Sequence, residues 1–265
     1  MDNSFGISYL KKNDGEIENL AYDTGYEKCA HLYDLFDTKE NIEFFLHYGS
    51  EAGEVLDIGA GTGRIAIPLA KKGIKVSCVE PSPAMRGQFN KKLSALPKLA
   101  KNVQLVAGDA KSFNFDRTFP AAILSGSFDH FLDDQERLSS LHNIAKHLEP
   151  GGTLVFDVGI GYMDDSPLKP AGQIKAENKE YRRFISRKRM PNDTLDWFLI
   201  YEVHRSGKLI ERIEQHSSAG IIDRARLHHI LKETGFKIRR EFGDYDFSSF
   251  EEGNSVLIIE AAKIR

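Results

Sequence analysis

The sequence has little cysteine, with only Cys29 and Cys78 among 265 residues. Two cysteines cannot supply the disulfide framework of a small secreted protein, and Cys78 lies in an apolar run that favours a buried thiol over a nucleophile. Residues 1–14 lack a basic region followed by an apolar run, and no apolar segment reaches transmembrane length. We therefore expect a cytoplasmic protein without a membrane partner.

An excess of one charge is absent as well. The formal net charge is −3, with 36 basic residues against 39 acidic ones, which removes the electrostatic case for binding of the whole protein to nucleic acid or to a membrane. Four histidines of the C-terminal third form no recognisable metal motif with cysteines or acids: His204, His216, His228 and His229. We predict no metal site, and we see no internal repeat or low-complexity tract.

The chain does have ordinary globular composition, with 41% hydrophobic and 28% charged residues, and is long enough to bury a full core. Strand-like apolar runs alternate with helical segments between residues 55 and 158, which predicts a parallel α/β sheet. The expected strands are 55–58, 75–79, 103–106, 121–124 and 154–158. The expected helices between them are 65–72, 82–93 and 133–148.

The C-terminal region predicts a helix at 223–234 and strands at 236–240 and 255–261. The segment 159–220 before it is too long for a simple loop. Apolar residues alternate there at 197, 199, 201 and 203, a turn follows at 205–208, and 209–216 can return as a second strand. With a third strand at 179–188, we expect a small antiparallel layer over the carboxyl edge of the sheet.

The segment EVLDIGAGTGR, residues 54–64, is the most informative motif. Gly59, Gly61 and Gly63 alternate directly after a strand, where glycine lets backbone amides approach a ligand at the start of a helix. A dinucleotide fingerprint has the spacing G-x-G-x-x-G, and Arg64 occupies its third glycine position here. Glu80 ends the second strand, where a carboxylate can accept hydrogen bonds from both ribose hydroxyls.

With Asp57 ahead of the glycines, these features resemble the class I S-adenosylmethionine-dependent methyltransferases, of the small-molecule type with an antiparallel insertion after the fifth strand. The resemblance implies a Rossmann-like sheet of seven strands flanked by helices, with the last strand antiparallel. It also implies S-adenosyl-L-methionine as cofactor and S-adenosyl-L-homocysteine as product. The cofactor-binding residues that it implies are Tyr22, Tyr33, Asp57, Gly59, Ala60, Gly61, Gly63, Glu80, Pro81, Met85, Asp109, Ala110 and Ser125.

Several of these assignments have a structural alternative. Asp109 resembles the family's acid that contacts the adenine amine, but an Asp in a turn is usually a turn residue. Met85 lies near the expected adenine or simply in the core, and Ser82 is the expected N-cap of the helix that follows. Tyr22 and Tyr33 resemble an aromatic N-terminal lid that offers a cation–π contact to a sulfonium, or they pack a helix into the core.

The fourth strand leads into Ser125-Gly126-Ser127-Phe128-Asp129-His130-Phe131. By resemblance, Phe128, His130 and Phe131 line the acceptor pocket, and His130 is the candidate catalytic residue because imidazole accepts a proton near neutral pH. A structural histidine is the alternative. The Asn/Asp-Pro-Pro-Tyr pattern of methyltransferases that act on nucleobase amines or glutamine amides is absent here. Residues 148–152 match the family's L-x-P-G-G turn, whose role is structural.

The predicted organisation has three parts. Residues 1–50 form a helical segment and cofactor lid, 51–160 with 221–265 form the cofactor-binding domain, and 161–220 form the insertion, which serves as an acceptor lid or a homodimer contact. We predict methyl transfer to an N or O atom of a small molecule by direct in-line displacement.

Three alternatives remain open at this point. The first is RNA or protein methylation, suggested by eight basic residues against two acidic ones in 169–189. That stretch could also hold an anionic acceptor. The second is an NAD-dependent oxidoreductase, and the third is a cofactor-binding protein without turnover.

Overall fold

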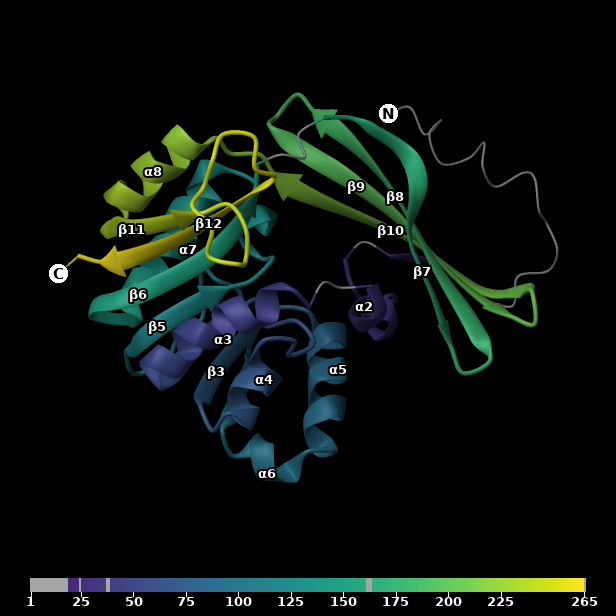
Figure 1. Ribbon diagram of the computed structural model, residues 1–265, viewed down its shortest axis with the longest axis horizontal. Coiled ribbons are helices and arrows are strands. Elements are labelled where there is room, and N and C mark those ends of the chain that lie inside the picture. The colour runs from purple at the N-terminus through teal and green to yellow at the C-terminus, as the bar shows by residue number, and fades with distance from the viewer. Residues whose placement is uncertain (1–18, 24, 37–38, 161–163, 265) are drawn as a thin grey trace.

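The computed structural model describes residues 19–23, 25–36, 39–160 and 164–264, with the backbone alone at positions 19, 20 and 22. Two sheets organise them (Figure 1), one of seven strands in the order β11-β12-β6-β5-β2-β3-β4 and one of five in the order β1-β10-β9-β8-β7. The first contains β2 (Glu54–Ile58), β3 (Lys75–Glu80), β4 (Val103–Ala107), β5 (Phe119–Leu124), β6 (Leu148–Gly159), β11 (Phe236–Phe242) and β12 (Val256–Lys263).

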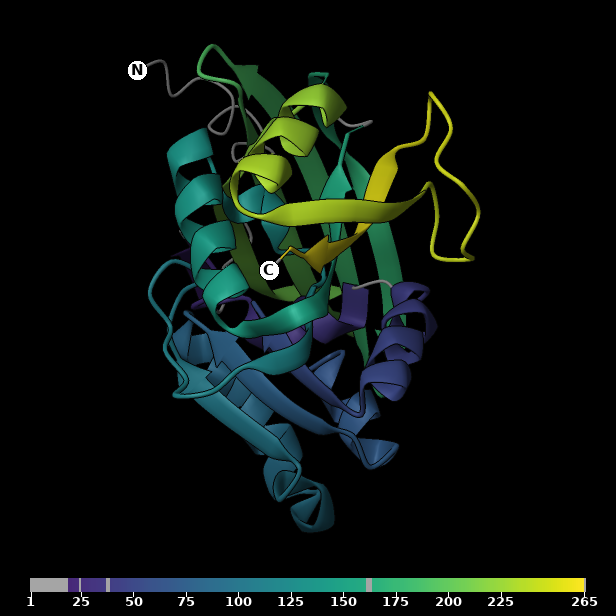
Figure 2. The same cartoon turned by 90° about the vertical axis from the view of Figure 1, so that its left-hand side faces the viewer.

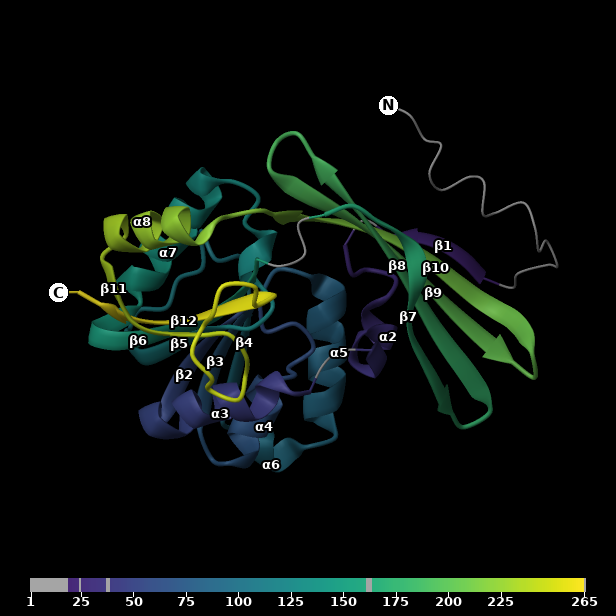
Figure 3. The same cartoon turned by 45° about the horizontal axis from the view of Figure 1, so that its top comes forward.

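The seven-stranded sheet confirms the predicted fold class. Strands β2 to β6 are mutually parallel, and β12 is antiparallel to both of its neighbours, β6 and β11. Helices cover both faces (Figure 3). On one side lie α3 (Asn41–Ala52), α4 (Ala66–Lys71), α5 (Pro83–Ser94) and the short α6 (Pro97–Ala100), and on the other lie α7 (Asp134–Lys146) and α8 (Arg224–Glu233).

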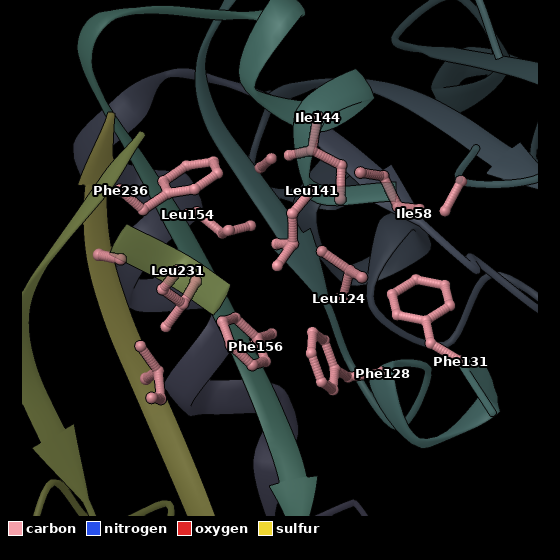
Figure 4. Packing of buried hydrophobic residues seen from close by; sticks show 14 of the residues in the cluster. Ile58, Leu124, Phe128, Phe131, Leu141, Ile144, Leu154, Phe156, Leu231 and Phe236 are labelled. Atoms are coloured by element: carbon pink, nitrogen blue, oxygen red, sulfur yellow. The ribbon is translucent and has the colours of Figure 1, made fainter. Parts of the chain in front are cut away.

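The core explains why these strands are almost continuously apolar: both of their faces are buried under helices. Leu124 and Phe156 of the sheet pack against Leu141 and Ile144 of α7 (Figure 4). All four side chains have no exposed surface, and burying each contributes roughly 1.5–3 kcal/mol. The packed sheet therefore gives a rigid edge at the carboxyl ends of β2, β3 and β5.

The inserted sheet has more strands than the sequence predicts. It contains β7 (Ser166–Ala176), β8 (Lys179–Met190), β9 (Thr194–Arg205) and β10 (Lys208–Gly220), joined by antiparallel pairing. The additional strand β1 (Asn19–Asp23) comes from the N-terminal segment and pairs parallel with β10. Residues 1–50 thus contribute a strand to the insertion as well as α2 (Ala30–Phe36) and most of α3.

Helix α2 lies between the inserted sheet and the α/β body (Figure 1). Leu32 of α2 packs with Tyr201, Val203 and Ile213 on one face of the inserted sheet. The basic stretch of β8 is divided between the two faces: the guanidinium of Arg183 lies 5.2 Å from the Phe36 ring, next to α2, and its sequence neighbour Arg182 points to the other face.

Several smaller observations complete the fold. The loop between β11 and β12 extends beyond the sheet (Figure 2), and its Phe247 stacks on Phe44 of α3 with centroids 4.6 Å apart.

Cys29 and Cys78 are buried free thiols. Within the described parts of the chain, every helix is too short or too polar to span a membrane, and no cluster of His, Cys, Asp or Glu is arranged to hold a metal ion.

Candidate cofactor and acceptor site

The three glycines of the turn after β2 have different surroundings. All three have positive φ, at 72°, 56° and 83° for Gly59, Gly61 and Gly63, a region that favours glycine. A Cβ at Gly59 would stand 2.8 Å from the Cβ of Ser127, and one at Gly63 would overlap the ring of Phe89. At Gly61 the nearest atom to such a Cβ is a backbone oxygen 4.0 Å away, so this position is open to a ligand.

Glu80 at the end of β3 ties two backbone segments together. One of its carboxylate oxygens accepts from the Gly61 N–H at 2.8 Å, and the other accepts from the Ser82 N–H at 2.7 Å. Burial raises the pKa of Glu80, and these two bonds oppose the rise. Each oxygen has a further lone pair for a hydroxyl donor. Ser82 is the predicted N-cap, because its hydroxyl accepts from the Met85 N–H at 3.3 Å.

A cavity of about 340 Å³ opens at the carboxyl ends of β2, β3 and β5. Eleven of the residues predicted from the sequence line it: Tyr33, Gly59, Gly61, Glu80, Pro81, Met85, Asp109, Ala110, Ser125, His130 and Phe131. Ten lining residues were not among the predicted site residues: Tyr26, Ile58, Val79, Ser82, Gly108, Lys111, Leu124, Gly126, Ser127 and Glu136. The structure therefore brings the candidates from five separate segments to one hollow.

Other predicted residues lie elsewhere. Gly63 packs on Phe89 behind the turn, and neither it nor Ala60 belongs to the cavity wall. Phe128 is 1% exposed and stacks on Phe156 at 4.5 Å in the core (Figure 4). Tyr22 pairs with Glu214 through the backbone of β1, and its side chain lies outside the described part of the structure.

Asp57 is buried beneath the glycine turn, outside the cavity wall. Its side chain is 2% exposed, and Oδ2 has no hydrogen-bond partner. Burial raises the pKa of Asp57 to about 7, and the nearby charge of Arg64 opposes this rise. A buried carboxylate with an unsatisfied oxygen is costly in its charged form, so the charged form of Asp57 lowers the stability of the folded state.

One end of the cavity is formed by the turn after β4. Oδ1 of Asp109 accepts from the Lys111 N–H and from the Ser112 hydroxyl, both at 2.9 Å, so Asp109 does serve as a turn residue. Those bonds use a single oxygen. Lys111 pairs with Glu136 of α7 at 2.8 Å, and this ion pair closes the cavity between the turn and the helix.

At the other end, Ser125 belongs to a polar network. Its hydroxyl accepts from Asn41 Nδ2 at 3.0 Å and from Arg64 Nη2 at 3.1 Å. Asp157 accepts from the Gly126 N–H and, at 2.7 Å, from the hydroxyl of Tyr245. The network places the positive charge of Arg64 beside Ser125 and holds the turn after β5 in position.

His130 and Tyr26 form a pair at the mouth of the cavity. The Tyr26 hydroxyl lies 3.2 Å from His130 Nε2, and the Tyr26 ring also meets Tyr33 edge to face at 5.6 Å. The His130 ring is exposed to the cavity, but the surrounding protein limits its hydration, and this desolvation lowers its pKa below the ordinary value. The lowered pKa favours the neutral imidazole, which can accept a proton.

Comparisons with known proteins agree with this geometry. Residues 55–152 match the family model described as "Methyltransferase domain". The chain is 33% identical to a cypemycin N-terminal methyltransferase of Streptomyces sp over 112 residues, which is 42% of this chain and 44% of that relative. The chain thus matches less than half of the length of this relative.

Two solved structures share the fold. An S-adenosylmethionine-dependent methyltransferase from Clostridium acetobutylicum ATCC 824 has a TM-score of 0.74 at 18% identity, covering 91% of this chain and 99% of that one. The sugar N-methyltransferase KedS8 from Streptoalloteichus sp ATCC 53650 has a TM-score of 0.74 at 19% identity, covering 96% and 100%. Residues 55–152 thus match a methyltransferase domain, and the fold of the chain is that of S-adenosylmethionine-dependent methyltransferases of known structure.

Proposed function

We propose that this chain transfers the methyl group of S-adenosylmethionine to a nitrogen atom of a small-molecule acceptor. One observation carries the proposal: the glycine turn and Glu80 open onto the same cavity as the neutral base His130. The names of the cypemycin N-terminal methyltransferase and of the sugar N-methyltransferase KedS8 both describe transfer to nitrogen, which favours nitrogen over oxygen as the acceptor atom.

The residues of the cavity fit the cofactor from end to end. Glu80 offers two carboxylate oxygens to a ribose diol, and the open position at Gly61 leaves room beside it. Asp109 offers its second oxygen to the adenine amine. Ser125 and Arg64 offer a hydroxyl and a positive charge to the methionine carboxylate.

S-adenosylmethionine supplies a methyl group on a sulfonium leaving group, so direct in-line displacement needs no covalent enzyme intermediate. The chain's contribution is to orient the acceptor and to exclude water, and good orientation alone is worth about 7–11 kcal/mol in favourable cases. Tyr26, Tyr33 and Phe131 form the apolar part of the wall around the mouth. They are placed to keep water from the reacting atoms.

His130 has the chemistry to manage the proton of the acceptor. An amine that arrives as an ammonium ion must lose a proton before its lone pair is available, and a neutral imidazole can take it. When Nε2–H donates to the Tyr26 oxygen, Nδ1 is the accepting atom. The contact with Tyr26 then holds the orientation of the ring, which is a positioning role.

The experiment that tests the proposal is a transfer assay with methyl-labelled S-adenosylmethionine. The acceptor panel pairs amino sugars and short peptides that have free amines with analogues in which each amine is replaced by a hydroxyl. We expect label in an amine acceptor and much less in its matched hydroxyl analogue. Equal labelling of both would contradict the preference for nitrogen, and tight cofactor binding without transfer to any acceptor would favour a binding protein.

A further inference from the structure

The turn that carries His130 is held from two directions. It consists of residues 127–132, which include the short 3-10 helix Phe128–His130. One holding contact comes from Gly159, the last residue of β6, and the other comes from Gly220, the last residue of β10. These two glycines are the points where the chain leaves the α/β body for β7–β10 and where it returns.

The contact at Gly220 is made by the backbone itself. A Cβ at this position would stand 2.9 Å from the Cα of Leu132 and 2.5 Å from Arg137 Nη2, and it would overlap the carbonyl oxygen of Phe131. Real Cβ atoms do not approach other atoms this closely, so any side chain at Gly220 would displace the turn just after His130. The reason for glycine at this position is the close approach of the turn and not its backbone conformation, since the φ of Gly220 is not in the positive region.

This junction continues into the inserted sheet through further hydrogen bonds. Arg137 is 4% exposed, and its Nη2 donates to the carbonyl of Ile221 at 3.2 Å. The Ile221 N–H donates in turn to the carbonyl of Asp193 at 2.8 Å, in the turn between β8 and β9. The His130 turn, α7 and two hairpin strands of the insertion are thus joined by backbone contacts and one buried arginine.

The contact at Gly159 is made to a side chain of the turn. Its N–H donates to both carboxylate oxygens of Asp129, at 3.3 and 3.2 Å, and Asp129 immediately precedes His130. A Cβ at Gly159 would stand 3.2 Å from Asp129 Oδ2. That distance is tight, but a shift of a few tenths of an ångström in one carboxylate relieves it, so this junction is more tolerant than the one at Gly220.

We infer that Gly159 and Gly220 are positioning residues that fix the His130 turn to the end of β6 in the seven-stranded sheet and to the end of β10 in the inserted sheet. The end of β10 and the candidate base consequently move as one unit, so a displacement of this junction changes the position of His130 in the cavity. The role of His130 as a base rests on the proposed function. The mechanical coupling itself is independent of turnover, because it follows from backbone contacts that no flexible side chain interrupts at Gly220.

Three glycine-to-alanine variants of the full chain test the inference. Gly220→Ala is the severe change, Gly159→Ala is the mild one, and Gly87→Ala on α5 is the control, because its Cβ would meet no atom within 4 Å. The first readout is the ring ¹H–¹³C signal of His130 by NMR, assigned with His130→Gln. The second is the Kd for S-adenosylmethionine by calorimetry, and the third is kcat and KM for whichever acceptor the labelled assay identifies.

We expect the His130 signal to move most in Gly220→Ala, less in Gly159→Ala and not in Gly87→Ala, with Kd for the cofactor within about twofold in all three. A displacement near 1 Å in a reacting group can cost on the order of 100-fold, so kcat should fall about 10- to 100-fold in Gly220→Ala while KM for the cofactor is kept. An unchanged His130 signal in Gly220→Ala would overturn the inference.

If Gly220→Ala does not fold, Gly159→Ala decides the matter, since a single carboxylate can accommodate its Cβ. A moved His130 signal in that variant supports the coupling, and a signal identical to the Gly87→Ala control contradicts it. The NMR readout requires no methyl transfer. If the His130 signal moves but the protein methylates no acceptor, the result counts against the proposed function and still supports the coupling of the turn to the junction.

Discussion

Replacing Glu80 with glutamine tests the cofactor assignment with the smallest change of shape. The carboxylate of Glu80 already holds the N–H groups of Gly61 and Ser82, and it is proposed to accept two ribose hydroxyls as well. Glutamine has one accepting oxygen, and its NH₂ group must face either a backbone N–H or a hydroxyl. At least one charge-assisted bond to the cofactor is lost, and such bonds are worth about 1.5–3 kcal/mol.

That loss corresponds to a Kd for S-adenosylmethionine weakened roughly 10- to 150-fold. Because Glu80 is only 5% exposed, water does not readily replace the missing acceptor. The assay is calorimetric titration with S-adenosylmethionine and S-adenosylhomocysteine, with urea unfolding to confirm that the variant is folded. Glu51→Gln, at a side chain that is 62% exposed on α3, is the matched control. A Kd within about twofold of the unmodified protein would refute the role given to Glu80.

Three further predictions follow from the same geometry. Gly61→Arg should abolish measurable cofactor binding in calorimetry, because the arginine side chain would fill the open space left for the ligand. Circular dichroism should stay native, because the Cβ of the arginine meets no neighbouring side chain and the positive φ at this position costs only about 1–2 kcal/mol. His130→Gln should remove the rise of kcat/KM with pH, which in the unmodified protein should occur below the ordinary histidine pKa. Asp57→Asn should raise the free energy of unfolding at pH 8 but not at pH 4. The pKa of Asp57 is raised to about 7 in the folded state, so the loss of folding stability caused by its charged carboxylate grows between about pH 4 and pH 7. Urea titrations at several pH values measure the free energy of unfolding.

The seven-stranded sheet could be predicted because its signals are local. Apolar runs and helix caps repeat along residues 55–158, and the boundaries agree within a few residues except at β6, which begins at Leu148 instead of 154. Pro150-Gly151-Gly152 falls within that strand, where the pairing with β5 shifts register. Strand β7 was missed because Pro167, Pro170 and Gly172 disrupt its pattern.

The remaining differences come from contacts between distant parts of the chain. The pairing of β1 with β10 joins the N-terminal segment to residues 211–215, and no short-range pattern encodes it. Tyr26 was passed over in favour of Tyr22 because its partner His130 lies far along the sequence. Phe128 and Phe131 look alike in sequence, but the 3-10 helix turns the first into the core and leaves the second at the cavity.

Within the glycine motif, the sequence predicts the turn but does not distinguish the three glycines. Only the packing against Ser127 and Phe89 shows that Gly59 and Gly63 are confined by neighbours and that Gly61 alone faces open space. Glu80 was correctly placed at the end of its strand, since position along a parallel strand determines which edge a side chain reaches. Its bonds to the Gly61 and Ser82 amides depend on the folded turn.

The most direct test of the central claim is a side-by-side calorimetric titration of the purified protein with S-adenosylmethionine, S-adenosylhomocysteine and NAD. We expect saturable binding of the first two, with Kd weakened by Glu80→Gln, and no binding of NAD. Binding of NAD alone would contradict it and would place the cavity among the nicotinamide-dependent enzymes.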